Sequence, residues 1–237
     1  MRLVILTTNT LHHARFVQRI SIRFPITRVF EETTNVSAPF ETAHPFENLR
    51  DEYEHEVWFP DHNASVEDFA SVRRFENLND LDAVAELAAL SADVVMVFGT
   101  RRLKPAVIEA AGPNMINLHG GNPERYRGLD THLWAIFHED FANLVITLHT
   151  VNEALDDGRI VAAQPVPISP GMKLHQLRAA NTEVCIRLSM AVLEEFAEVE
   201  RITSRDQRDK GRYYSFMPTN LKELCLSNFH RYTEKLT

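Results

Sequence analysis

Short apolar runs alternate with stretches of helical periodicity along most of the chain. Residues 2–7 form a β-rich apolar run, and residues 26–30 form a second one. Between the two runs, four apolar residues recur at the spacing of one helix face: Leu11, Phe16, Ile20 and Phe24. The pattern predicts that the chain opens with a β-α-β unit.

The same alternation continues through the middle of the chain. Asn79 is expected to cap a helix over residues 81–90, and the continuous apolar run 93–99 is typical of a buried parallel strand. A helix over 105–111, ended by Gly112, leads to a strand over 114–119. The prediction continues with a helix over 131–138 and two strands over 144–151 and 159–167. A long amphipathic helix over 173–198 and a polar tail over 201–237 complete it.

These elements predict an α/β fold, a Rossmann-like, mostly parallel sheet flanked by helices. We expect one catalytic domain over residues 1–200 and a short C-terminal extension over 201–237. Residues 31–70 are polar and ambiguous, although 47–59 fit a helix with three residues on one face: Leu49, Tyr53 and Val57. An aromatic cluster in the extension is expected to dock on the domain or on a partner subunit, so a homodimer stays open: Tyr213, Tyr214 and Phe216.

Composition and charge then limit the function classes. The chain has 237 residues, of which 44% are hydrophobic and 24% charged, as in an ordinary globular protein. Its formal net charge of −8 disfavours a protein that binds nucleic acid through a basic face. The apolar run at the N-terminus is too short for a signal peptide or a membrane span, so we expect a cytoplasmic protein without a membrane partner.

Four common signatures of cofactor or metal binding are missing from the sequence. The turn after the first predicted strand, TTNTLHH, has no glycine, which disfavours a dinucleotide-binding fingerprint and a P-loop. Cys185 and Cys225 are isolated, and the chain has neither a CxxC pair nor an HExxH motif. We therefore expect no metal site and no disulfide, with both thiols buried.

The polar residues with the clearest chemical pattern follow the strand over 114–119. Asn117 and His119 are two residues apart, so their side chains share one face, and Asp156 follows later in a loop before a strand. An amide and an imidazolium can donate to the oxyanion formed in acyl transfer to an amine, and a carboxylate can hold the imidazole. Taken alone, the N-x-H pair also fits a satisfied polar pair, and LDDG also fits an ordinary turn.

A longer resemblance supports the catalytic interpretation. Residues 94–166 contain Asn117-Leu118-His119, Tyr126-Arg127-Gly128, Ile146-Thr147-Leu148-His149 and Leu155-Asp156-Asp157-Gly158 in one order. This multi-part pattern resembles the folate-dependent formyltransferase family, which includes glycinamide ribonucleotide transformylase, the catalytic domain of methionyl-tRNA formyltransferase and N-formyltransferases of nucleotide-linked amino sugars. The resemblance implies that the catalytic residues are Asn117, His119 and Asp156.

The resemblance also implies a donor and a site for it. The donor would be N10-formyltetrahydrofolate, whose pteridine edge can be paired by loop backbone groups while apolar side chains cover its faces. Two segments match the family's pocket, and they imply the following folate-binding residues: Gly99, Arg102, Leu103, Asn152, Ala154, Leu155 and Asp157. Arg101 and Arg102 equally fit a solvated pair at the start of a helix.

Departures from the family pattern narrow the range of expected acceptor substrates. The glycine-rich phosphate loop of glycinamide ribonucleotide transformylase is absent, and the roughly 37 residues after Glu200 are too few for an independent tRNA-binding domain. The resemblance thus favours an amino sugar linked to a nucleotide diphosphate, of the kind used in lipopolysaccharide O-antigen biosynthesis. Acceptor contacts are expected from Thr10, His12, His13, Gly120, Gly121, Asn122, His132 and Trp134.

Other functions stay open at this point. One is the formylation of another small amine, such as hydroxyornithine or glycinamide ribonucleotide. A second is a non-catalytic protein that binds folate, although the joint presence of Asn117, His119 and Asp156 speaks against it.

Overall fold

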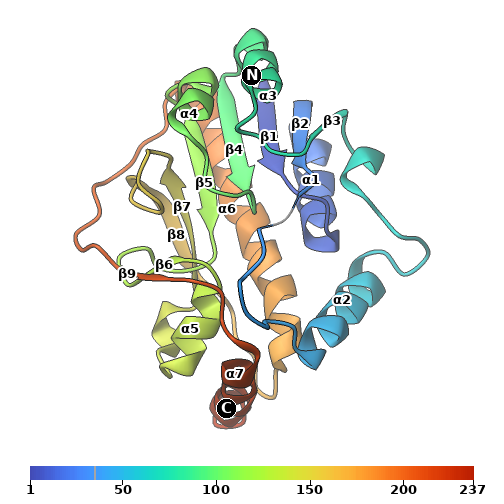
Figure 1. The fold of residues 1–237 in the computed structure, drawn as a ribbon, viewed down its shortest axis with the longest axis vertical. Coiled ribbons are helices and arrows are strands. Elements are labelled where there is room, and N and C mark those ends of the chain that lie inside the picture. The colour runs from blue at the N-terminus through green and yellow to red at the C-terminus, as the bar shows by residue number, and fades with distance from the viewer. Residues whose placement is uncertain (35) are drawn as a thin grey trace.

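A computed structural model describes residues 1–34 and 36–237. Seven strands form the central sheet in the order β3-β2-β1-β4-β5-β7-β8 (Figure 1). The first five are parallel: β1 (Leu3–Thr7), β2 (Ile26–Glu32), β3 (Val72–Phe75), β4 (Val94–Phe98) and β5 (Met115–His119). The last two run antiparallel to their neighbours: β7 (Val145–Thr150) and β8 (Ile160–Pro165).

Helices connect and cover these strands, which confirms the predicted α/β class. In chain order they are α1 (Leu11–Arg23), α2 (Pro45–Trp58), α3 (Leu81–Leu90), α4 (Pro105–Ala111), α5 (Thr131–Phe137), α6 (Leu177–Val199) and α7 (Thr219–Thr233). Short 3-10 turns occupy Val66–Asp68, Phe141–Asn143 and Leu174–Gln176. In the described residues, no helix is both long and apolar enough to cross a lipid bilayer.

The sheet is buried on both faces, which explains the continuous apolar runs of its inner strands. On one face, Leu3 and Met96 pack with residues of α1 and α6, and on the other face, Val4 and Val97 pack with residues of α3 and α4. Because successive strand residues point to opposite faces, Leu3–Leu6 of β1 and all of β4 carry apolar side chains at consecutive positions.

Several details differ from the sequence-based expectations. Asp80, and not Asn79, occupies the N-cap of α3, because the Asn79 side chain is engaged elsewhere and accepts from the Lys104 amide at 2.6 Å. In α2, Leu49 and Val57 are exposed, while Glu54 is fully buried. Glu54 accepts two hydrogen bonds of 2.6 Å from Arg178 of α6, so a buried ion pair docks this helix together with the buried Phe46.

The segment after α6 is folded, not a polar tail. Its strand β9 (Arg212–Tyr214) pairs in parallel with β6 (Tyr126–Gly128) as a separate two-stranded sheet. Its helix α7 packs beside α5 (Figure 1) and buries Cys225 and Phe229 completely. Both cysteines are buried and free, as expected from their spacing. This C-terminal segment therefore forms part of the same body as the sheet.

Candidate active site

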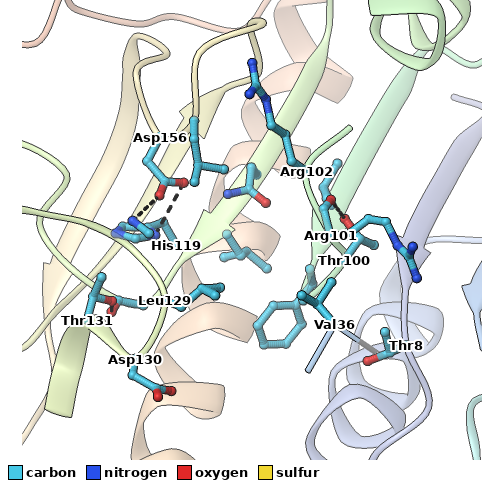
Figure 2. Close-up of a pocket in the computed structure, with 18 of the residues that line it drawn as sticks. Thr8, Val36, Thr100, Arg101, Arg102, His119, Leu129, Asp130, Thr131 and Asp156 are labelled. Carbon is cyan, nitrogen blue, oxygen red and sulfur yellow. Dashed lines mark hydrogen bonds and ion pairs between the residues drawn. The ribbon is translucent and has the colours of Figure 1, made fainter. Parts of the chain in front are cut away.

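A large cavity lies where β4 and β5 end, at the edge of the sheet where ligands of open parallel sheets bind. Its volume is about 1130 Å³, and both Asn117 and His119 of β5 line it. Figure 2 shows His119 and Asp156 facing each other, with Arg102 on one side of the pair and Leu129 and Asp130 on another. The cavity thus has two parts that meet at the pair.

Asn117 and His149 lie opposite each other across the β5–β7 pair. The Asn117 Nδ2 atom is 3.1 Å from the His149 Nε2 atom, and His149 Nδ1 is 2.8 Å from the Thr150 carbonyl oxygen. A carbonyl only accepts, so Nδ1 of His149 carries a hydrogen and donates it. His149 was not among the predicted site residues, although its place in the ITLH segment, in register with Asn117, could have indicated it.

Asp156 completes the cluster from the loop between β7 and β8. Its Oδ1 atom is 3.6 Å from His119 Nδ1 and 3.5 Å from His149 Nε2, and its Oδ2 accepts from the Gly128 amide at 2.7 Å. Burial raises the pKa of Asp156, but His119, His149 and the Gly128 amide together lower it to about 2. The carboxylate is therefore ionised at neutral pH.

His119 is held in one tautomer. Its Nε2 atom donates to the Tyr126 carbonyl oxygen at 2.9 Å, so in the neutral ring the lone pair lies on Nδ1, the atom that faces Asp156. Burial lowers the pKa of His119 below its usual value, and the opposing effect of Asp156 does not restore it. The imidazole is consequently neutral at rest, and not the cation that the sequence argument assumed.

The predicted folate residues lie together at one end of the cavity, with one exception. Those that line it are Gly99, Arg102, Leu103, Asn152, Ala154 and Leu155. Asp157 is not among the lining residues, because its carboxylate turns toward Arg127 and Lys210, at 3.6 and 3.7 Å. Apolar side chains and two irregular segments of backbone share this end, which suits a flat heterocycle with a polar edge.

Only some of the residues predicted to bind the acceptor line the cavity. His12, Gly120 and His132 line the cavity, whereas five others do not: Thr10, His13, Gly121, Asn122 and Trp134. The His13 ring is buried against Gly99, and its Nδ1 atom is 2.9 Å from the Thr10 hydroxyl. Trp134 packs on Tyr214 and donates to the Ser215 carbonyl oxygen at 2.8 Å. Asn122 donates to the Asn143 side chain at 2.9 Å.

Residues from distant parts of the chain line the second end of the cavity instead. They come from α2, the start of α5, α6 and the C-terminal segment: Phe46, Arg50, Asp130, Arg178, Asn181, Tyr213 and Phe216. No local pattern in the sequence indicated them, because only the fold brings these four segments together.

Comparisons with known proteins agree with this architecture. The profile of the formyl transferase family matches residues 44–192, more than half of the chain. Methionyl-tRNA formyltransferase of Sulfurimonas denitrificans is 26% identical over 136 residues, 57% of this chain and 44% of that protein. Phosphoribosylglycinamide formyltransferase of Haemophilus influenzae is 30% identical over 124 residues, 52% of this chain and 58% of that protein. The matches thus span about half the length of these relatives.

Two solved structures show the same fold at low sequence identity. Formyltransferase PseJ from Anoxybacillus kamchatkensis, in complex with UDP-4,6-dideoxy-4-formamido-L-AltNAc and tetrahydrofolate, aligns with a TM-score of 0.53 and 18% identity, covering 90% of this chain and 85% of its own. Phosphoribosylglycinamide formyltransferase from Streptococcus pneumoniae aligns with a TM-score of 0.59 and 16% identity, covering 83% of this chain and 99% of its own. With the family profile spanning β4, β5 and the Asp156 loop, the chain belongs to the formyl transferase family.

Proposed function

We propose that this protein transfers a formyl group from N10-formyltetrahydrofolate to the amine of a nucleotide-linked amino sugar. The observation that carries the proposal is the cluster of Asn117, His119 and Asp156 at the junction of the two ends of one cavity. One end suits the folate and the other would take the acceptor, so the formyl carbon and the amine can meet beside the cluster.

The resting state of His119 makes it a base. As the amine nitrogen bonds to the formyl carbon, Nδ1 of His119 takes a proton from that nitrogen, and the formyl oxygen becomes an oxyanion. The Asp156 carboxylate, 3.6 Å from Nδ1, stabilises the imidazolium that results. The proton then passes to N10 as the bond from carbon to N10 breaks, which yields a formamide and tetrahydrofolate.

Asn117 supplies the second interaction with the oxyanion. Its amide nitrogen has two N–H bonds, and one of them is directed at His149 Nε2, 3.1 Å away. The other N–H, together with the His119 imidazolium, can donate to the oxyanion. His149 in turn is fixed by its bond to the Thr150 carbonyl oxygen, so it holds the Asn117 amide in place.

The second end of the cavity supports an acceptor larger than a simple amine. Arg50 and Arg178 line it, and their guanidinium groups suit phosphate oxygens. Both are held by carboxylates, since Arg178 pairs with the buried Glu54 and Arg50 donates to Asp51 at 3.0 Å. Tyr213 and Phe216 add aromatic surface of the kind that bases and sugars pack against. PseJ, which shares the fold, was solved with a UDP-linked formamido sugar.

An acceptor screen tests the substrate class. We expect formylated product, followed by mass spectrometry, when the protein and N10-formyltetrahydrofolate are incubated with GDP-, UDP- or dTDP-linked 3-amino or 4-amino sugars. Glycinamide ribonucleotide and hydroxyornithine serve as the competing small amines in the same panel. Formylation of either small amine, with no product from any nucleotide sugar, would contradict the proposed class of acceptor but not the proposed formyl transfer. Folate binding without turnover of any amine would instead support a non-catalytic protein.

The pH dependence tests the role of His119 as a base. Because burial lowers the pKa of His119, its neutral form persists to below pH 6.5, and we expect kcat to fall only as pH drops through that lowered pKa. Asp156, with a pKa of about 2, stays ionised throughout this range. The check is an NMR titration of the His119 ring alongside kcat measured with chemistry rate-limiting. The role of His119 as a base would be excluded if its NMR titration had a midpoint above pH 6.5. It would also be excluded if the fall of kcat at acid pH did not follow that titration.

A further inference from the structure

Part of the C-terminal segment, residues 204–214, runs along the loop that follows His119 and the loop that carries Asp156, and we call it the strap. Arg205 exchanges two backbone hydrogen bonds of 2.8 Å with Ile160 at the start of β8. Its side chain pairs with Glu124, in the loop that follows His119, at 2.9 Å. Further along, Gly211 donates to the Pro123 carbonyl oxygen at 3.1 Å, and β9 pairs with β6. The strap therefore joins the loop after β5 to the loop before β8.

Gln207 of the strap bonds through its side chain to the backbone of the loop that holds Asp156. Its Nε2 atom donates to the carbonyl oxygens of Asp156, at 2.9 Å, and Gly158, at 2.8 Å. Both partners are acceptors only, so the amide nitrogen and not the amide oxygen must face the loop. One side chain thus ties together the residues on both sides of Asp157.

Asp156 needs such support because its backbone is strained. Its φ of 51° lies in the left-handed region, which non-glycine residues hold only where surrounding bonds impose it. Arg127 donates to the carbonyl oxygen of Leu155, the residue before Asp156, at 2.9 Å. Gln207 donates to the carbonyl oxygens of Asp156 itself and of Gly158. The position of the carboxylate, 3.6 Å from His119, depends on this backbone conformation.

We propose that Gln207 is a positioning residue for the transfer reaction, which sets the Asp156 carboxylate against His119 by bridging the two backbone carbonyls of its loop. The proposal rests on the role of Asp156 in the proposed function. It also implies that the catalytic centre is incomplete without the strap, which lies outside the region matched by the family profile.

The test compares Gln207→Ala and Gln207→Glu with a matched control from the same strap. In Gln207→Glu the shape is kept, but an ionised carboxylate donates nothing and repels both carbonyl oxygens. Gln207→Lys restores a donor. The control is Asp206→Asn, which removes only the exposed ion pair with Arg159, at 2.7 Å. For each variant, we would measure thermal unfolding, kcat and KM, and the His119 pKa. The pKa is measured by NMR titration, which requires no acceptor substrate.

We expect kcat to fall by roughly 10- to 100-fold in the Ala and Glu variants, because small displacements of a catalytic group have effects of this size. KM should change by less than about threefold, as Gln207 does not line the cavity. The His119 pKa should fall further, since Asp156 raises it in the native protein. The Lys variant should recover part of kcat, and Asp206→Asn should match the native protein.

Three outcomes would overturn the proposal. The first is a His119 pKa in the Ala and Glu variants equal to the native value. The second is a loss of kcat in Asp206→Asn as large as in Gln207→Ala, which would indicate general loosening of the strap. The third is a Lys variant no more active than the Glu variant. If no amine is formylated by the native protein, the NMR titration still decides the role of Gln207 separately from the proposed function.

Discussion

His119→Ala is expected to lower kcat by about 10²- to 10⁴-fold while the protein stays folded. The side chain would be the base for the attacking amine, a donor to the oxyanion and then the acid that protonates N10, and effects of this size are typical of such groups. Asn117→Ala and Asp156→Ala should each cost roughly 10²-fold or more, because all three residues act on the same tetrahedral intermediate. Single-turnover kinetics with saturating donor measures the loss of rate, and circular dichroism checks that each variant is folded.

Asp157→Asn provides the matched control for the Asp156 variant. The two aspartates are adjacent in one loop, yet Asp157 is partly exposed and makes only long ion pairs, with the buried Arg127 at 3.6 Å and the exposed Lys210 at 3.7 Å. We expect its kcat to stay within about threefold of the native value, since ion pairs of this kind contribute roughly 0–1 kcal/mol. Near-native turnover by His119→Ala, with an undamaged fold, would mean that the mechanism is wrong.

Gly128→Ala is expected to reduce both stability and turnover. Gly128 has a φ of 98°, and an added Cβ atom would lie 2.1 Å from the Tyr214 carbonyl oxygen, so β6 and β9 must separate. The clash should lower the free energy of unfolding by roughly 1–3 kcal/mol beyond the backbone strain. Because the Gly128 amide donates to Asp156 at 2.7 Å, kcat should also fall by about tenfold or more.

Gly112→Ala separates crowding from backbone strain. Gly112 has a similar φ of 78°, but no atom of the described residues lies within 4 Å of the position that an added Cβ atom would take. The variant should therefore lose only about 1–3 kcal/mol, from a backbone conformation (φ 78°, ψ −172°) that essentially only glycine adopts, with kcat unchanged. Urea unfolding of both variants checks the difference. Equal losses of stability and activity in the two would show that the contact with Tyr214 has no particular importance.

The cluster of Asn117, His119 and Asp156 could be predicted because its signals are local. Asn117 and His119 share a strand face by simple alternation, and the LDDG turn gives Asp156 a defined place before the next strand. The fold class followed from the same kind of signal, since the apolar runs of β1 and β4 indicate strands buried on both faces.

The residues that line the second end of the cavity could not be predicted in the same way. Asn122 and Trp134 follow His119 in the sequence, yet their side chains are used in bonds to Asn143 and Ser215. Arg50 and Arg178 are far apart in sequence and line the cavity because a buried carboxylate, Glu54, joins α2 to α6. A buried ion pair of this kind has no periodic signature, and an amphipathic pattern even suggested the wrong face of α2.

The strap also has a consequence for the order in which the protein becomes active during synthesis. Asn117, His119 and Asp156 have all been translated once the ribosome passes Asp156, and the five neighbouring parallel strands of the central sheet are complete earlier still. The bonds from Gln207 to the loop, and the pairing of β9 with β6, must wait for some fifty more residues, from Asp156 to Gln207 and beyond. A nascent chain therefore carries Asn117, His119 and Asp156 before the strap can hold the loop of Asp156 in place.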